Sequence, residues 1–399
     1  MRAAFIALVL VALASCDNAP TTSAHAATTA ITTPAEASRL GALRSDATPA
    51  GFALVTQPMQ FEFPRDHGPH PTFRHEWWYV TGHLDAKTGE RFGFELTFFR
   101  FALTPPAAAS DGPQAEHSAW RTRQVYMAHF AVTDLDRRQF HATERYARDA
   151  LQMAGAQASP FRVWLDDWSL GTPAGETGPE GSSYWQLRAA DKGYALDLQL
   201  RPVTPPVLNG DAGLSQKSAA PGAASYYYSM PRLAAFGHVQ RDGKPLDVEG
   251  LAWLDREWGS GSLGADQQGW DWFALQLDDG STLMFYALRK LNGQRDAHSA
   301  GTWFAPDGTT HPLANDDVQI DVKAFWSSPR GGRYPARWQL RVPSLGLDVE
   351  IEPRLADQEL DTNPRYWEGA ATVAGTRAGT KVGGRAYVEL VGYAASPNR

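Results

Sequence analysis

Hydrophobic and polar residues alternate in several segments of the chain after residue 51. The alternation is clear at 92–98, 194–200, 338–342 and 347–351, where every second residue is apolar. Successive side chains of a strand point to opposite faces of a sheet, so this pattern predicts half-buried antiparallel strands. Turn signals such as Asp278-Asp279-Gly280 separate the predicted strands.

The sequence lacks helical apolar patterns of a dozen residues, and many short strands favour barrels or sandwiches. The predicted fold class is therefore all-β with few short helices. A weak repeat relates residues 77–84 to residues 226–239, each with an aromatic triplet before a Gly-His pair. We expect two tandem antiparallel β-barrel domains, at 51–224 and 225–399.

The N-terminus resembles the export signal of a bacterial lipoprotein. Residues 1–15 combine a basic start with a short apolar run, and Leu13-Ala14-Ser15-Cys16 resembles a lipobox. We expect cleavage before Cys16, lipidation of its thiol, and a flexible tether at 16–50. The alternative is an ordinary signal peptide that is cut near 24–26. Asp17 resembles the signal that keeps lipoproteins in the inner membrane, so we expect a periplasmic, lipid-anchored protein.

Composition narrows the classes of partner. The 399 residues carry a net charge of −7 and include no long basic run, which argues against a nucleic-acid partner. The single cysteine excludes a disulfide framework and a cysteine-rich metal site. The 14 Trp, 13 Tyr and 18 Phe residues favour strands and an aromatic binding cavity.

Motifs for several kinds of active site are absent from the sequence, among them G-x-S-x-G, the phosphate-binding loop and H-E-x-x-H. His67 and His70, with Asp66, His75 and Glu76 nearby, could bind zinc. Prolines within this segment make it a loop rather than a preset helical face. We therefore favour loop histidines that are bonded to backbone or carboxylate groups, and we predict no metal site.

A carboxylate lies among aromatic residues in the segment His75-Glu76-Trp77-Trp78-Tyr79. On a strand, either Glu76 or His75 points toward a core. A buried glutamate needs a partner, which one of several nearby arginines could supply. The candidates are Arg65, Arg74 and Arg100. A structural ion pair and a catalytic role both remain open.

A second acidic segment places Trp253, Asp255 and Glu257 on one strand face. Two such close carboxylates repel each other, so one can have a raised pKa and act as an acid. Aromatic clusters at 270–272 and 366–368 could complete a site that protonates an alkene, because ring faces stabilise a carbocation. The alternative is a set of Trp-lined ion pairs that hold two β units together.

Several long motifs resemble those of the AttH-like secreted proteins, which are related to the bacterial carotenoid 1,2-hydratases. The motifs are FPRDHGPHPTFRHEWWYVTGHL, VYMAHFAVTD, WLDREWGSG, GWDWF, YWEG and YVELVGY. The similarity runs from about Phe52 to Tyr393. It implies two tandem lipocalin-like β domains.

The resemblance also implies an activity and a set of site residues. Carotenoid 1,2-hydratases add water to a terminal trisubstituted double bond without metal or organic cofactor. By motif, Asp255 is the proton donor, with Trp253 on the same strand face and Tyr226 and Tyr228 on the adjoining strand. The expected ligand-binding residues are Glu76, Trp77, Trp78, Trp258, Trp270, Trp272 and Trp367.

The first functional hypothesis is thus a hydratase-like enzyme that acts on a carotenoid or another isoprenoid-type lipophile. The rival is a lipophile-binding lipoprotein that partners an ABC-transporter permease, because AttH-like genes tend to accompany transporter genes. A cyclase is a third possibility, since one fold can support several chemistries.

Overall fold

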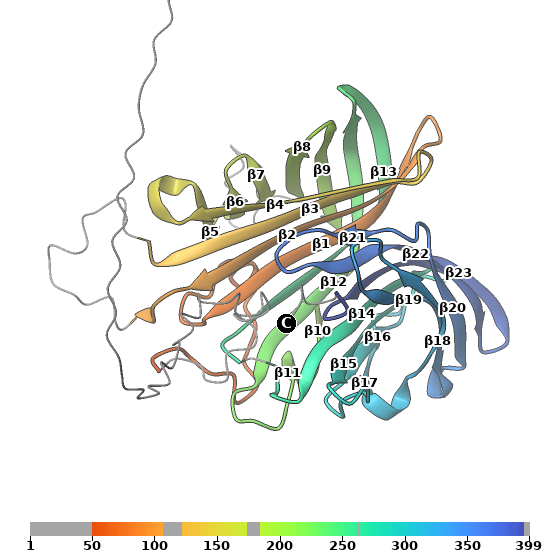
Figure 1. Ribbon diagram of the computed structural model, residues 1–399. Helices are drawn as coiled ribbons and strands as arrows, with labels where there is room; N and C mark the ends of the chain where they lie inside the picture. Colours follow the sequence, from red (N-terminus) through yellow and green to blue (C-terminus); the bar gives the residue numbers. More distant parts are fainter. Residues whose placement is uncertain (1–49, 107–121, 174–183, 262, 395–399) are drawn as a thin grey trace, which may run out of the picture. The chain divides into compact units, whose positions relative to one another are not determined.

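The computed structural model of the chain consists almost entirely of β-strands, which confirms the all-β prediction (Figure 1). The predicted signal peptide, Cys16, Asp17 and nearly all of the predicted tether lie outside the described residues. The residues that the structure describes are 50–106, 122–173, 184–261 and 263–394.

The strands form two curled antiparallel sheets. The first has 13 strands, in the order β4-β3-β2-β1-β13-β12-β9-β8-β7-β6-β5, with β10 and β11 paired to β12. Their bounds are β1 (His75–Ala86), β2 (Arg91–Ala102), β3 (Gln124–Asp134), β4 (Gln139–Arg148), β5 (Ala154–Ala158), β6 (Phe161–Leu165), β7 (Trp168–Gly171), β8 (Trp185–Asp191), β9 (Tyr194–Pro202), β10 (Val207–Leu208), β11 (Leu214–Gln216), β12 (Ala224–Arg241) and β13 (Lys244–Gly259).

The second sheet has 10 strands, in the order β17-β16-β15-β14-β23-β22-β20-β19-β18, with β21 paired to β22. Their bounds are β14 (Gln267–Leu277), β15 (Thr282–Lys290), β16 (Ala300–Phe304), β17 (Thr310–Ala314), β18 (Gln319–Ser327), β19 (Arg333–Val342), β20 (Leu347–Pro353), β21 (Glu359–Leu360), β22 (Tyr366–Arg377) and β23 (Thr380–Leu390).

The helical content of the described residues is limited to short 3-10 turns. They are η1 (Arg65–His67), η3 (Ala150–Gln152), η4 (Asn315–Asp317) and η5 (Pro343–Leu345). In the described ranges, no helix has the length and apolar character needed to cross a membrane.

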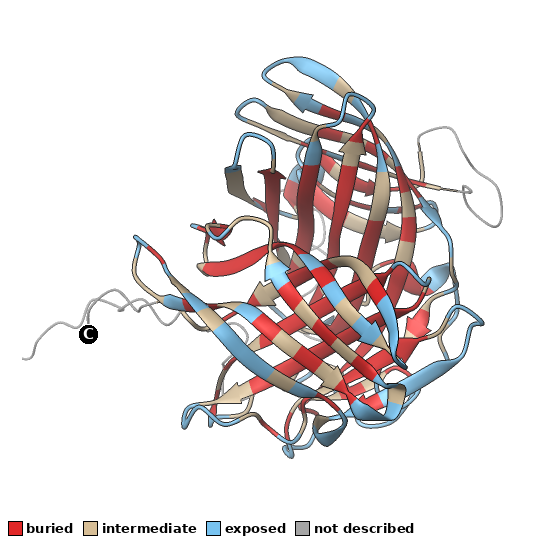
Figure 2. Cartoon of the chain, turned by 90° about the vertical axis from the view of Figure 1, so that its right-hand side faces the viewer, coloured by how far each residue is buried: buried red, intermediate tan, exposed pale blue. Residues whose placement is uncertain are grey.

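The predicted alternation holds on some strands and is overridden on others (Figure 2). On β9, Leu196 and Leu198 are buried, whereas Asp197 between them is partly exposed, as expected for a half-buried strand. On β2, the polar positions between the phenylalanines are buried as well. The second sheet covers that face so closely that a Cβ on Gly93 would lie 2.7 Å from the Cβ of Ala370.

The two segments of the weak repeat lie in the same sheet. Residues 77–84 belong to β1 and residues 226–239 to β12, and both strands pair with β13. The first sheet therefore continues past residue 225, and the second begins at Gln267. The domain division at residue 225 remains a prediction about separate folding units.

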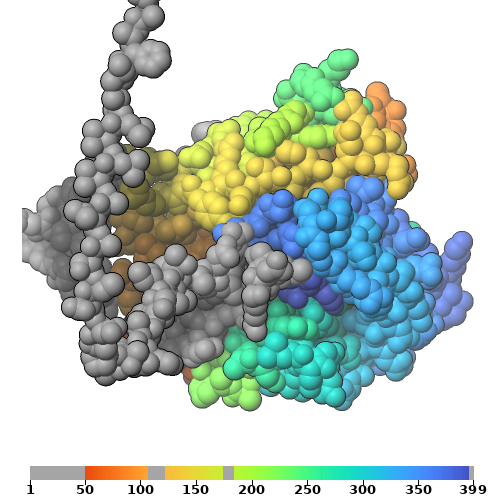
Figure 3. Space-filling view, in the orientation of Figure 1, coloured from red at the N-terminus to blue at the C-terminus, as the bar shows by residue number. Residues whose placement is uncertain are grey.

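Each sheet encloses its own apolar core, and a third cluster lies where the sheets meet. This third cluster is rich in aromatic residues from both sheets, including Tyr79, Tyr227, Trp253, Trp272 and Tyr286. Figure 3 shows the blue residues of the second sheet directly against the yellow residues of the first. The meeting point of the sheets is therefore where an aromatic site can form.

Candidate active site

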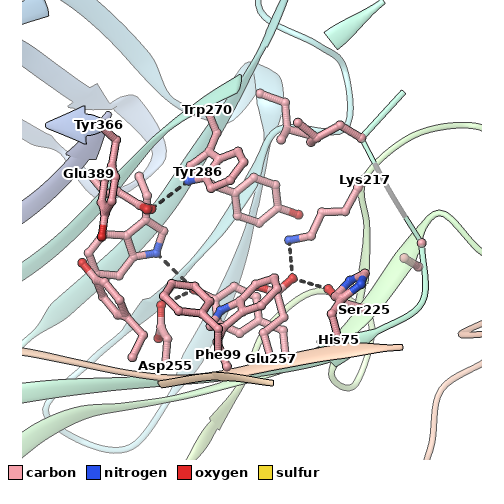
Figure 4. Close-up of a pocket in the computed structure, with 18 of the residues that line it drawn as sticks. His75, Phe99, Lys217, Ser225, Asp255, Glu257, Trp270, Tyr286, Tyr366 and Glu389 are labelled. Carbon is pink, nitrogen blue, oxygen red and sulfur yellow. Dashed lines mark hydrogen bonds and ion pairs between the residues drawn. The ribbon is translucent and has the colours of Figure 1, made fainter. Parts of the chain in front are cut away.

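A cavity of about 140 Å³ lies between the two sheets (Figure 4). This is roughly ten times the 10–15 Å³ that a single water molecule needs, so the cavity has room for part of an organic ligand. Aromatic rings form most of its wall, and a few ionisable groups project among them. The lining residues discussed below are Trp77, Lys217, Tyr227, Asp255, Glu257, Trp270, Trp272, Tyr286, Tyr366 and Glu389.

Asp255 faces this cavity from β13. Trp253 Nε1 and Ser229 Oγ each donate a hydrogen bond of 2.6 Å to its Oδ1 atom. The Tyr227 hydroxyl donates a short hydrogen bond to Oδ2. Burial raises the pKa of Asp255 to about 7 although these three hydrogen bonds lower it, and nearby Glu257 raises it further. The carboxyl group can therefore be protonated near neutral pH.

The tyrosine that reaches Asp255 is Tyr227, and neither Tyr226 nor Tyr228 lines the cavity. In the pairing of β12 with β13, Tyr227 lies directly opposite Glu257. Directly opposed residues share a face of the sheet, so the cavity face holds the middle tyrosine. Three consecutive tyrosines put either the middle one or the outer two on a given face, and only the pairing register decides which.

The outer tyrosines hold the segment that precedes β1. Tyr226 donates a hydrogen bond of 2.9 Å from its hydroxyl to the carbonyl oxygen of Gln57. The Tyr228 hydroxyl lies 2.7 Å from His67 Nδ1. Both tyrosines are therefore structural contacts on the face opposite the cavity.

The predicted tryptophans divide between the cavity and the cores. Those that line the cavity are Trp77, Trp270 and Trp272. Those buried in the cores are Trp78, Trp258 and Trp367. Trp77 and Trp78 are neighbours on β1, so they point to opposite faces and only one can reach the cavity.

Glu76 is fully buried and does not line the cavity. Arg100 Nε donates a short hydrogen bond to its Oε1, and Arg256 Nη2 lies 2.6 Å from its Oε2. Burial alone would raise the pKa of Glu76, but the two guanidinium groups outweigh burial and hold the pKa well below its usual value. This geometry fits the structural ion pair, one of the two roles that the sequence leaves open for Glu76, and Arg100 is one of the predicted partners.

The loop histidines contact side chains of the same region. His70 stacks on Trp258 with ring centroids 3.8 Å apart, and its Nδ1 lies 3.3 Å from Glu76 Oε2. His67 contacts Tyr228 as described above. In the part of the chain that the structure describes, no group of three or more His, Cys, Asp or Glu side chains is arranged to hold a metal ion.

A second carboxyl group, that of Glu389 on β23, reaches the cavity from the other sheet. Trp270 Nε1 donates a hydrogen bond of 2.7 Å to its Oε2 (Figure 4). Burial raises the pKa of Glu389 to about 7, and the charges of Asp255 and Glu257 raise it further. The cavity thus carries two carboxyl groups, from opposite sheets, that titrate near neutral pH.

Two more buried acids lie beside Glu389. The Tyr79 hydroxyl donates a hydrogen bond of 2.5 Å to Glu368, and Thr97 donates one of 2.5 Å to Glu95. Burial raises the pKa of Glu95 to about 8 and that of Glu368 well above its usual value. The interface between the sheets therefore holds carboxyl groups in the neutral, protonated form.

An ion pair completes the lining. Lys217 Nζ lies 3.0 Å from Glu257 Oε1, and Ser225 donates a short hydrogen bond to the same carboxylate (Figure 4). No sequence pattern predicts a role for Lys217 or Glu389. Glu389 lies in the YVELVGY motif and in an alternating segment, and neither feature distinguishes it from a surface residue of a strand.

The fold and the site define a class of protein: two curled antiparallel sheets enclose an aromatic cavity that carries carboxylic acids. The AttH-like family matches residues 54–393, and the chain belongs to this family. The resemblance noted in the sequence is thereby confirmed.

Two solved structures and one curated protein are similar to this chain. The crystal structure of an AttH protein from Nitrosomonas europaea is 34% identical with a TM-score of 0.74, over 86% of this chain and 100% of that one. Kievitone hydratase from Nectria haematococca has a TM-score of 0.62 over 87% of this chain and 97% of that one. Its identity is 17%, so the likeness shows the fold alone.

The curated protein is dehydratase asqC from Emericella nidulans, which is 25% identical over 236 residues. The match covers 56% of this chain and 66% of that relative.

Proposed function

We propose that the protein is a hydro-lyase that adds water to, or removes water from, a carbon–carbon double bond of a hydrophobic, isoprenoid-type ligand. The observation that carries this proposal is the environment of Asp255. Its carboxyl group faces an aromatic cavity, and burial raises its pKa to about 7. The nearby cations pair with other acids: Arg256 with Glu76, and Lys217 with Glu257.

In the hydration direction, Asp255 transfers its proton to one alkene carbon, so a C–H bond forms as the π bond breaks. Positive charge develops on the other alkene carbon, where the ring faces of Trp77 and Trp272 stabilise it. A water molecule then forms the C–O bond, and Glu389 accepts the proton that the water loses. Glu389 then releases this proton to water and Asp255 takes one up from water, which restores both groups. Dehydration follows the same steps in reverse.

The names of two relatives support this reaction class. One is a dehydratase and the other a hydratase, so both names describe the removal or addition of water.

A second proposal is a non-catalytic lipoprotein that holds a carotenoid or another lipophile for an ABC-transporter permease. The apolar, aromatic wall of the cavity favours it, because such a wall binds a lipophile whether or not a reaction follows. We propose for both functions that Cys16 anchors the protein at the periplasmic face of the inner membrane.

The test incubates the purified full-length protein with lycopene or farnesol, which both contain trisubstituted double bonds, in water labelled with heavy oxygen. Mass spectrometry should detect one labelled oxygen in the product.

Asp255→Asn should fold normally and lose at least about 100-fold in rate, the lower end of what a general acid contributes. Asp197→Asn on β9 is the control and should keep full activity. Full activity in Asp255→Asn would refute the mechanism. Binding of either probe without turnover in the parent protein would favour the carrier.

A further inference from the structure

Lys217 reaches the wall of the cavity from a loop whose backbone is held by hydrogen bonds. Its amide donates a hydrogen bond of 2.8 Å to the carbonyl oxygen of Ala223, and Gln267 Nε2 donates one of 2.8 Å to the carbonyl oxygen of Lys217. The ammonium nitrogen lies 4.0 Å from the ring centroid of Tyr286 and 5.2 Å from that of Tyr227. The loop between β11 and β12 thus anchors the backbone of Lys217, and its ammonium group lies against the two tyrosine rings and Glu257.

The charge of Lys217 is balanced within the cavity. Burial lowers the pKa of Lys217, but the carboxylate of Glu257 outweighs burial and raises the pKa above its usual value. The ammonium group and the carboxylate are thus both charged, and their charges cancel. A buried ion pair rarely adds more stability than apolar residues of the same volume would, so its presence in an apolar wall calls for another explanation. An ammonium group has three N–H donors, and Glu257 Oε1 accepts along only one direction.

We propose that Lys217 and Glu257 form an oxygen-binding subsite, and that the ligand is an uncharged lipophile with a hydroxyl or carbonyl oxygen at one end. This inference rests on the proposed function and names the substrate class of the same cavity. Lys217 donates a hydrogen bond to the ligand oxygen, and a ligand hydroxyl can donate one to Glu257. An anionic head group is disfavoured, because the carboxylate of Glu257 already neutralises the ammonium group.

The strand geometry also places the reacting bond. Asp255 and Glu257 lie on the same face of β13 and are two residues apart, which corresponds to about 7 Å along a strand. A ligand whose oxygen binds at Lys217 therefore presents to Asp255 a double bond several carbon atoms away from that oxygen. The subsite thus selects an oxygenated lipophile with a remote alkene and fixes its direction in the cavity.

The test measures the binding of three probes with the same carbon skeleton to the full-length protein: farnesol, farnesene and farnesoic acid. Changes in tryptophan fluorescence report binding, since Trp77, Trp270 and Trp272 line the cavity. Farnesol should bind at least about tenfold more tightly than farnesene, the lower end for a hydrogen bond to a charged group. Lys217→Met should remove this preference and leave farnesene binding within about twofold of the parent value. Lys244→Met, at an exposed lysine, is the control.

Glu257→Gln provides a second variant with the opposite signature. It leaves the ammonium group without its carboxylate, so farnesoic acid should become the preferred probe. Equal binding of farnesol and farnesene by the parent protein, or binding of neither, would overturn the subsite. If Lys217→Met weakens the binding of farnesol and farnesene equally, the subsite is also refuted. Failure of the proposed hydro-lyase function is a separate result, in which the farnesol preference persists but no labelled oxygen enters any probe.

Discussion

Asp255 and Arg256 are neighbours in the chain, but their side chains lie on opposite sides of β13. Arg256 Nη2 lies 2.6 Å from Glu76 Oε2, whereas Asp255 accepts a hydrogen bond of 2.6 Å from Trp253 at the cavity. Successive residues of a strand point to opposite faces, so the arginine does not reach the acid beside it. The raised pKa of Asp255 depends on this separation.

The pH dependence of stability should flatten when Asp255 is replaced by Asn. The ordinary pKa of the group is 3.8 and burial raises it to about 7 in the folded protein. Between these values the folded state binds more protons than the unfolded state, so the free energy of unfolding falls as the pH rises through this window and levels off above it. The difference between the two pKa values corresponds to roughly 4 kcal/mol. Urea unfolding of the parent and Asp255→Asn proteins at several pH values across this window measures the effect. If the free energy of unfolding changes with pH equally in both proteins, the prediction is wrong.

Tyr227→Phe should raise the pKa of Asp255. The tyrosine donates a hydrogen bond that stabilises the charged carboxylate, and its loss favours the protonated form. The expected rise is about one pKa unit, from the energy of a hydrogen bond to a charged group. Infrared titration of the protonated carboxyl band measures it. Tyr226→Phe, whose hydroxyl contacts Gln57 instead, is the matched control and should leave the band unchanged. The same shift in both variants would refute the assignment to Tyr227.

Glu76→Ala should destabilise the fold by about 3–5 kcal/mol, the usual penalty for stranding a buried partner charge. Here the stranded charges are Arg100 and Arg256. Urea unfolding measures the loss, and Asp247→Ala, which breaks an exposed pair with Lys87, should cost far less. Farnesol binding should persist in Glu76→Ala under native conditions. Loss of binding without loss of stability would instead make Glu76 a functional residue.

Cys16→Ser should abolish lipidation. The parent protein should incorporate labelled palmitate and sediment with membranes, because the thiol of Cys16 is the attachment point of the predicted lipobox pathway. The variant should remain unlabelled and leave the membrane fraction. If the parent never takes up the label and the variant still sediments fully, the anchor must have another origin.

The sequence predicts strands well where solvent covers one face of the sheet. The alternation at 194–200 corresponds to a half-buried strand, β9. At 92–98 the same alternation accompanies burial on both faces of β2, because the second sheet covers the polar positions. No local pattern near residue 95 predicts the contact with the second sheet, since the covering residues on β22 are more than 250 positions away in the chain.

The site shows the same limit. Strand alternation and the motif together place Asp255 on the same strand face as Trp253, and in the structure Trp253 donates a hydrogen bond to Asp255. The choice among the three tyrosines depended on the register of β12 against β13, which the sequence does not encode locally. Glu389 reaches the cavity because β23 pairs with β14, and Lys217 because a loop is fixed against Gln267. The positions of both side chains therefore depend on contacts between segments that are distant in the sequence.

The wall of the cavity comes from two sheets, and this has a practical consequence. A molecule that fills the cavity binds only where the sheets are packed together, so it shifts the folding equilibrium by mass action. At a concentration of 100 times its Kd, such a molecule adds about 2.7 kcal/mol to the free energy of unfolding. Melting curves recorded across a compound library can therefore reveal the natural ligand before any reaction has been observed.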